Sequence, residues 1–330
     1  MILTRGARVT GAVLCAVLAL MAAGWIVRDV NAADGIGQLG ERWAGFYDAR
    51  FTMPPTTSAY DPVLLVVYAA AAVAALRSSV AAGALVAVGV VTIGVRLPGL
   101  WNIGEARMDA RFSDDLRTRA LIGAFVALAA GIALVITAGA GRRPVRDHAE
   151  RPPARPGTGA GVIVLLGLGA AAVVTIGWEV RQAVRGPDVY PDWYLGGDRI
   201  FQPLTDPPPG WFSVLLALLC LFAAVSAVAR GAHARPFGLI AAGLVLLEGV
   251  LSVIRTVHYD LLRHFPDLPV ENELLVLTGF FQVFAGAVTL LAAALPGRAA
   301  PAPAQGFGPG YGPWPGPFGP PPPSQPPPGW

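Results

Sequence analysis

Eight uninterrupted runs of apolar residues constrain this chain more than any other feature of its sequence. Hydrophobic residues fill 54% of the 330 positions and charged residues 14%, whereas a soluble domain carries about a quarter charged residues. Most runs reach the roughly 17–25 apolar residues that a membrane-spanning helix needs. We therefore predict an all-α integral membrane protein that spans the bilayer at residues 9–27, 62–76, 80–95, 120–140, 159–178, 211–229, 237–254 and 274–295.

The helix count depends on the second and third runs, which are short and are separated only by residues 77–79. A tight turn at the membrane surface explains this spacing, so we predict eight helices, with seven or nine as the alternatives. The first run resembles a secretory signal, because Arg5 and Arg8 precede it and small residues follow it. We predict a retained spanning helix instead, because the five-residue motif at its end recurs later in the chain.

That motif, GWIVR at residues 24–28, returns as GWEVR at residues 177–181, which is 153 positions later. Such self-similarity predicts an internal duplication of a four-helix unit. Since four is even, both units enter the membrane in the same direction, as parallel repeats. Other pairs support the duplication: AALR at 74–77 with AVAR at 227–230, RFSD at 111–114 with HFPD at 264–267, and DARF at 48–51 with DRIF at 198–201.

The predicted domains follow from this repeat. They are a first four-helix membrane repeat (1–141), a basic cytoplasmic linker (142–157), a second four-helix membrane repeat (158–297) and a tail (298–330).

Arginine, which supplies every basic residue of the chain other than histidine, is concentrated in the short connections. Residues 1–8, 77–79, 141–157 and 230–236 hold ten arginines and two carboxylates, whereas the four long loops hold 13 arginines and 18 carboxylates. Basic short loops mark the cytoplasmic side, so we expect cytoplasmic N- and C-termini in a protein of the cell membrane. The net charge of +3 is too small and dispersed to predict a nucleic-acid partner.

Two of the long loops carry aromatic residues at helical spacing. We predict helices that lie on the outer membrane surface at residues 35–51 and 188–201, because Trp and Tyr favour the headgroup layer. The alternatives are loop aromatics that cover helix ends and an aromatic ligand-binding box. The residues concerned are Ile36, Leu39, Trp43, Phe46 and Tyr47 in the first segment, and Val189, Tyr190, Trp193, Tyr194 and Phe201 in the second.

Glu248 is the one acidic residue well inside an apolar run. It is the twelfth residue of the seventh run, at a depth of about 16 Å, near the middle of the membrane. Ser252 and Arg255 follow on the same helix face, and Gln282 of the eighth run is placed to reach it. These four residues form a candidate intramembrane polar site, either a proton or cation relay or a substrate anchor. The alternative is a structural hydrogen bond between helices.

Four arginines close apolar runs on the predicted outer side, namely Arg28, Arg96, Arg181 and Arg255. Such cations bind phosphates of lipids or of lipid-linked substrates, so they are candidate outer-face anion contacts. The alternative is that they reach ordinary headgroups or pair with the acidic loops.

The remaining candidates for chemistry are weaker. His258 and His264, six residues apart in one outer loop, do not share a helix face, so we expect no metal there. Cys15 and Cys220 lie inside apolar runs and are expected to be apolar filler. No nucleophile, phosphate-binding or dinucleotide motif occurs, so no catalytic residue and no cofactor are predicted.

After Arg298 the chain reads AAPAPAQGFGPGYGPWPGPFGPPPPSQPPPGW. Proline and glycine dominate this tail, so we expect disorder with polyproline segments. The tail resembles those of many actinobacterial multi-pass membrane proteins, and the resemblance implies a type of protein without naming a family. A solvated extension and a docking segment for a cytoplasmic protein partner are both compatible with it.

Three functions remain open at this point. The leading hypothesis is a non-enzymatic scaffold or assembly partner in the lipid bilayer, because catalytic motifs are missing from the sequence. The alternative is a small-molecule or lipid transporter that uses Glu248. A second alternative is an outer-face enzyme that acts on a lipid-linked substrate through the arginines. The sequence indicates neither a substrate nor an oligomeric state.

Overall fold

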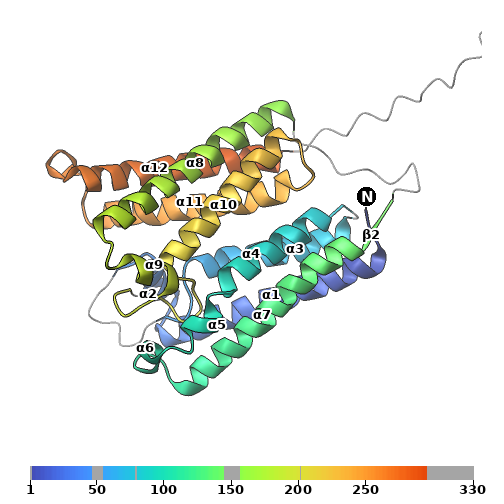
Figure 1. The fold of residues 1–330 in the computed structure, drawn as a ribbon, viewed down its shortest axis with the longest axis horizontal. Helices are drawn as coiled ribbons and strands as arrows, with labels where there is room; N and C mark the ends of the chain where they lie inside the picture. The colour runs from blue at the N-terminus through green and yellow to red at the C-terminus, as the bar shows by residue number, and fades with distance from the viewer. Residues whose placement is uncertain (1, 47–54, 79, 145–156, 201, 296–330) are drawn as a thin grey trace, which may run out of the picture. The chain divides into compact units, whose positions relative to one another are not determined.

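The computed structural model, which describes residues 2–46, 55–78, 80–144, 157–200 and 202–295, confirms the all-α architecture (Figure 1). Within these residues, eight helices are long and apolar enough to cross a membrane. Each predicted apolar run falls on one of them. They are α1 (Arg5–Ala32), α3 (Tyr60–Arg77), α4 (Ala82–Arg96), α7 (Asp114–Ala140), α8 (Thr158–Arg185), α10 (Pro209–Val228), α11 (Ala234–His258) and α12 (Val270–Ala294). The third of these reaches spanning length through its continuation as far as Asn102.

Several short helices lie together at one end of the long ones. Figure 1 labels α2, α5, α6 and α9 there. We call this end the loop end; it holds the described parts of residues 33–59, 97–113, 186–208 and 259–269. The opposite end is called the short-turn end. The short helices are α2 (Ile36–Trp43), α5 (Gly99–Asn102), α6 (Ala106–Asp109), α9 (Tyr190–Leu195) and the 3-10 helix η1 (Phe265–Asp267).

A two-stranded sheet that the sequence pattern did not predict closes the short-turn end of the first half. Strand β1 (Ile2–Leu3) pairs antiparallel with β2 (Arg142–Arg143), so that Leu3 lies opposite Arg142. The pairing joins the residues before α1 to those after α7. The first half of the chain therefore begins and ends at the same place.

The two predicted surface helices are shorter than expected. Helix α2 ends at Trp43, and the chain turns at Gly45, whose φ is +83°. Helix α9 ends at Leu195 because Gly196 follows with a φ of +85°. Backbone with positive φ suits glycine and stops a right-handed helix. Of the residues predicted in these segments, Tyr47, Asp48, Phe51 and Phe201 lie outside the described residues.

The four long helices of each half have the same set of neighbours. In the first half α1 and α4 each pack against α3 and α7; in the second half α8 and α11 each pack against α10 and α12. The halves meet where α11 contacts α3 and α4, and where α10 contacts α4. Figure 1 shows α1 and α8 both running from the short-turn end to the loop end. The tandem duplication itself stays a prediction.

Small residues allow the helices to approach closely. A Cβ atom built on Gly249 of α11 would collide with the backbone of Gln282 and Val283 on α12. Gly89 of α4 and Gly131 of α7 face each other in the same manner. Glycine contacts of this kind are typical of helices that associate in lipid, where van der Waals contact drives packing.

Large apolar side chains cover the outside of the long helices. Leu20, Phe284 and Leu291 are each at least 70% exposed. An aqueous protein rarely presents such side chains over a continuous surface, whereas lipid tails solvate them. The exposed apolar helices fit a lipid bilayer. The linker between residues 145 and 156 and the tail from residue 296 lie outside the described residues.

Candidate functional site

Buried polar side chains gather at the loop end, and Asp29 is the most heavily hydrogen-bonded of them. Its side chain, in the last turn of α1, is 1% exposed. Its two carboxylate oxygens accept bonds of 2.6–2.9 Å from the backbone amides and hydroxyls of Thr56 and Thr57. Arg28 adds a fifth bond of 2.6 Å from its Nη1. A buried carboxylate is tolerated when its oxygens have this many donors. The four bonds from Thr56 and Thr57 also hold the segment before α3 against the end of α1.

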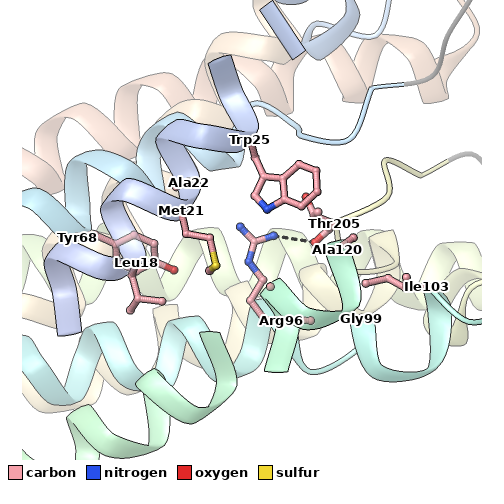
Figure 2. Close-up of a pocket in the computed structure, with 12 residues that line it drawn as sticks. Leu18, Met21, Ala22, Trp25, Tyr68, Arg96, Gly99, Ile103, Ala120 and Thr205 are labelled. Atoms are coloured by element: carbon pink, nitrogen blue, oxygen red, sulfur yellow. Dashed lines mark hydrogen bonds between the residues drawn. The ribbon is translucent and has the colours of Figure 1, made fainter. Parts of the chain in front are cut away.

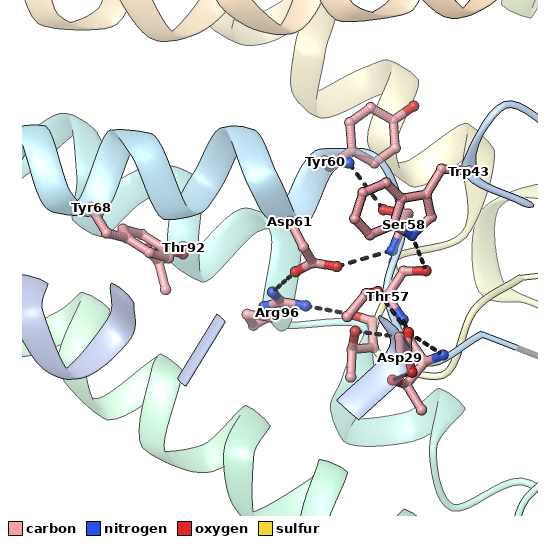
Figure 3. Close-up of polar contacts among 11 residues, drawn as sticks. Asp29, Trp43, Thr57, Ser58, Tyr60, Asp61, Tyr68, Thr92 and Arg96 are labelled. Atoms are coloured by element: carbon pink, nitrogen blue, oxygen red, sulfur yellow. Dashed lines mark hydrogen bonds and ion pairs between the residues drawn. The ribbon is translucent and has the colours of Figure 1, made fainter. Parts of the chain in front are cut away.

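The start of α3 carries the second buried carboxylate, Asp61. The Ser58 amide donates to Asp61 Oδ2 at 3.0 Å, and the Tyr60 amide donates to Ser58 Oγ at 3.3 Å. This reciprocal pattern resembles a capping box and satisfies amides that the helix start leaves unpaired. The other oxygen of Asp61 forms an ion pair with the buried Arg96 at the end of α4 (Figure 3). Asp61 therefore caps the start of α3 and connects it by an ion pair to the end of α4.

Hydrogen bonds to and from Thr205 connect the second half of the chain to this arrangement. Arg96 Nη1 donates to the Thr205 carbonyl at 2.7 Å. The Thr205 amide and hydroxyl donate to the Thr56 carbonyl at 3.0 and 2.7 Å. Trp43 of α2 donates its indole N–H to the Thr57 carbonyl at 3.2 Å. We call Asp29, Thr56, Thr57, Ser58, Asp61, Arg96, Thr205 and Asp206 the loop-end cluster.

Asp206 is the third buried carboxyl of the loop-end cluster and precedes α10. Burial, followed by the nearby carboxylate of Asp61, raises the pKa of Asp206 to about 8, while a hydrogen bond from Ser58 and the charge of Arg96 act in the opposite direction. Burial and a neighbouring carboxylate both disfavour the charged form, so the surroundings of Asp206 favour its protonated form.

A small cavity lies next to the loop-end cluster (Figure 2). Its volume is about 20 Å³, which accommodates about one water molecule. Arg96 projects into it toward Trp25 and Thr205 (Figure 2). Met21 and Tyr68 line the same space. A cavity of this size provides room for a bridging water beside the guanidinium and excludes an organic solute.

The predicted intramembrane site is only partly brought together. Glu248 accepts a hydrogen bond from the Tyr60 hydroxyl of α3 and lies within electrostatic range of Arg255. Ser252 packs against a glycine of α12, and Gln282 lies against Gly249. Among the hydrogen bonds of the described residues, none joins Glu248 to Ser252 or Gln282. The partner of Glu248 is thus a tyrosine from the other half of the chain, which sequence reasoning missed.

The four predicted anion contacts have different surroundings. Arg28 pairs with Asp29, Arg96 with Asp61, and Arg181 with Glu271 of α12. Arg255 is exposed and passes beside Gly45 after α2. Three of the four guanidiniums thus have acidic partners within the chain. Their role as anion contacts stays a prediction.

The histidine loop forms an aromatic cluster with the segment after α2. His258 stacks on Phe46 with ring centroids 3.7 Å apart, and Tyr259 meets both rings edge-on. His264 instead approaches the carbonyl of Asp260, with 3.2 Å between Nδ1 and the oxygen. The two histidines therefore have different neighbours.

Sequence reasoning missed the carboxyls of the loop-end cluster, although one local signal was present. The spacing of Ser58 and Asp61 directly before an apolar run is the signature of a helix start. Asp29 and Asp206 carry no such mark, because their partners, apart from Arg28 next to Asp29, lie 27 and more residues away. Only the folded chain brings them together.

Comparison of the chain with protein-family models, with curated proteins and with solved structures finds no match. The class of protein therefore follows from fold and site alone. It is an all-α multi-pass membrane protein whose loops are fastened by a buried network of hydrogen bonds and ion pairs.

Proposed function

We propose that this protein is a non-enzymatic scaffold or assembly partner that presents its loop end to another membrane or surface protein. One observation carries the proposal: the buried charges of Asp29, Asp61 and Arg96 all have partners within the chain. These ion pairs and hydrogen bonds hold the loops in one conformation. They also occupy the charged groups, which are then not free to bind or activate a substrate. A rigid loop surface lowers the entropic cost of binding a partner.

Exposed apolar side chains at the loop end support a role in binding. Ile36 of α2 and Leu195 of α9 are 62% and 58% exposed, and Tyr259 is 52% exposed. These residues lie outside the eight long helices. They suit a protein contact with an apolar centre.

The proposal includes an orientation and a second contact. The arginine-rich short connections favour cytoplasmic termini in the cell membrane. The loop end then faces outward, and the proline-rich tail is available to a cytoplasmic protein partner.

Photo-crosslinking in native membranes tests the scaffold function. A crosslinking amino acid at Ile36 or Leu195 is expected to capture the same protein. At Val173, which is 67% exposed in the middle of α8, it should capture lipid only. Deletion of residues 299–330 should remove a cytoplasmic partner and leave the loop-end product intact. Identical products from all three positions would refute a loop-end contact.

Transport is a second candidate, which the hydrogen bond between Tyr60 and Glu248 favours because it joins α3 of the first half to α11 of the second. Proteoliposomes with an entrapped pH-sensitive dye would report proton flux. If transport is the function, Glu248→Gln abolishes the flux and Tyr259→Phe retains it. Equal dye signals from protein-containing and protein-free liposomes would exclude a proton-coupled mechanism.

A further inference from the structure

An apolar groove runs along the second half at the loop end, between α8 and α10. Its volume is about 350 Å³, within the range of ligand-binding clefts. Its walls extend over about 12 Å of each helix, at 1.5 Å per residue. The wall residues are Ile176, Val180, Ala183 and Val184 on α8, and Ser213, Val214, Ala217, Leu218 and Leu221 on α10.

The groove opens toward the surroundings of the helices. Val180, Val184 and Leu218 are 58%, 74% and 59% exposed. Both walls belong to helices of membrane-spanning length and composition. The groove therefore opens into the leaflet on the loop-end side, where acyl chains are the available apolar molecules.

A carboxylate lies where the apolar stretch of α8 ends. Glu179 directly follows the run that closes at Trp178, and it lines the groove together with Tyr190. The Tyr194 hydroxyl donates to Glu179 Oε2 at 2.6 Å, and the Trp193 indole N–H donates to the same oxygen at 3.1 Å. Both donors are neutral, so they orient the carboxylate without compensating its charge.

The neighbouring arginines of α8 have a different partner. Arg181 and Arg185 both pair with Glu271 of α12, the second at 3.6 Å. Glu179 thus presents a negative charge at the groove, surrounded by the aromatic rings of α9. The Tyr190 and Tyr194 rings meet edge-on at 4.8 Å. Aromatic faces and a carboxylate are the groups that bind an ammonium ion.

Helix α9 is held firmly against the groove. A Cβ atom on Gly210, at the start of α10, would collide with the Trp193 ring, so the glycine allows the indole to pack directly on α10. The ring then reaches across to donate its N–H to Glu179 on α8. The carboxylate and the aromatic rings are therefore ordered before any ligand arrives.

We propose that the groove between α8 and α10 binds one acyl chain of a phospholipid whose headgroup carries an ammonium group, with Glu179 and the rings of α9 contacting that group. A headgroup without a cation brings only its phosphate, which Glu179 repels. The site thus selects amine-bearing lipids from the loop-end leaflet. This inference does not depend on the scaffold function.

Native mass spectrometry of the full chain in detergent tests the site. Phosphatidylethanolamine and phosphatidylglycerol with identical oleoyl chains are titrated separately, and phosphatidylcholine distinguishes a primary from a quaternary ammonium group. We expect the wild type to bind at least one ammonium lipid about fivefold more tightly than phosphatidylglycerol. Equal affinity for all three lipids would overturn the assignment.

Variants separate the charge from the groove. Glu179→Gln keeps an acceptor for the indole and phenol donors, so it should retain binding of the acyl chain and lose the headgroup preference. Leu218→Trp and Val214→Trp fill the groove and should abolish tight binding of all three lipids. Leu291→Trp, at a 70% exposed position of α12, is the matched control and should bind like the wild type. Groove and control variants with the same affinity, or an unchanged preference in Glu179→Gln, would refute the site.

Discussion

At the scale of single residues, Asp206 differs from its neighbours in the loop-end cluster because it combines burial with few donors. Asp29 accepts five hydrogen bonds, and Asp61 pairs with Arg96. Asp206 is 7% exposed and receives its bond from Ser58. Asp206 is therefore the member of the cluster whose surroundings favour a neutral carboxyl.

The pKa of Asp206 predicts how stability depends on pH. Burial and the neighbouring Asp61 raise this pKa from 3.8 to about 8, so the folded protein keeps a proton that the unfolded chain releases. The stabilisation is complete below about pH 4 and is lost as the pH rises to about 8. We expect the melting midpoint in detergent to fall over this range, relative to that of Asp206→Asn. A constant difference between the two proteins would contradict the raised pKa.

Tyr60 and Glu248 form a pair whose coupling is measurable. Tyr60→Phe leaves the Glu248 carboxyl without its donor, and Glu248→Leu removes the acceptor of the Tyr60 hydroxyl. Each change should lower the free energy of unfolding by about 1–3 kcal/mol. The double variant should lose less than the sum, because both changes break one bond. Denaturation in detergent measures all three, with Tyr259→Phe as the exposed control; additive losses would show that the bond contributes nothing.

At the scale of elements, close contact between α11 and α12 depends on glycines whose neighbours are backbone atoms. Gly249→Ala inserts a methyl group against Gln282 and Val283, whereas Gly243 of the same helix has no atom within 4 Å of an added Cβ. We expect Gly249→Ala to lower the free energy of unfolding by about 1–3 kcal/mol. Gly243→Ala should be neutral or slightly stabilising. Equal thermal midpoints for the two variants would contradict this packing.

The segment before α3 is an element without regular structure that depends on Asp29 for its position. Asp29→Ala leaves four donors of Thr56 and Thr57 without their acceptor, so the segment should open more often. In a chain with Cys15→Ala and Cys220→Ala, a cysteine at the buried Ala59 should react with maleimide about tenfold faster when Asp29 is removed. Asp115→Ala, which removes an exposed ion pair with Arg119, is the control. Unchanged labelling rates would show that other contacts hold the segment.

At the scale of the whole molecule, the prediction that remains is which side of the membrane each end faces. In the same cysteine-free background, cysteines at Ile36 and Leu195 should react with an impermeant maleimide on intact cells. A cysteine at Arg77, the last residue of α3, should react only after the membrane is permeabilised. Labelling of Ile36 and Leu195 from opposite sides would refute the parallel repeat.

The sequence predicted the helices well because a membrane-spanning helix depends on local composition alone. The apolar runs therefore fall on α1, α3, α4, α7, α8, α10, α11 and α12. The loop end was predicted poorly, since its order depends on pairings between distant residues. Arg96 reads in the sequence as a cation at a helix end, yet its partners Asp61 and Thr205 lie 35 and 109 positions away. Tyr60 was missed because its hydrogen bond to Glu248 spans 188 positions.

The pairing of Leu3 with Arg142 has a consequence for biosynthesis. Every contact that closes the first four helices into one body lies within the first 143 residues, so this body is able to form while the ribosome still makes the remainder. Thr205 emerges later and forms its hydrogen bonds with Thr56 and Arg96, which are already in place. Translation order thus allows the first half to form before the residues of the second half that contact it have been made.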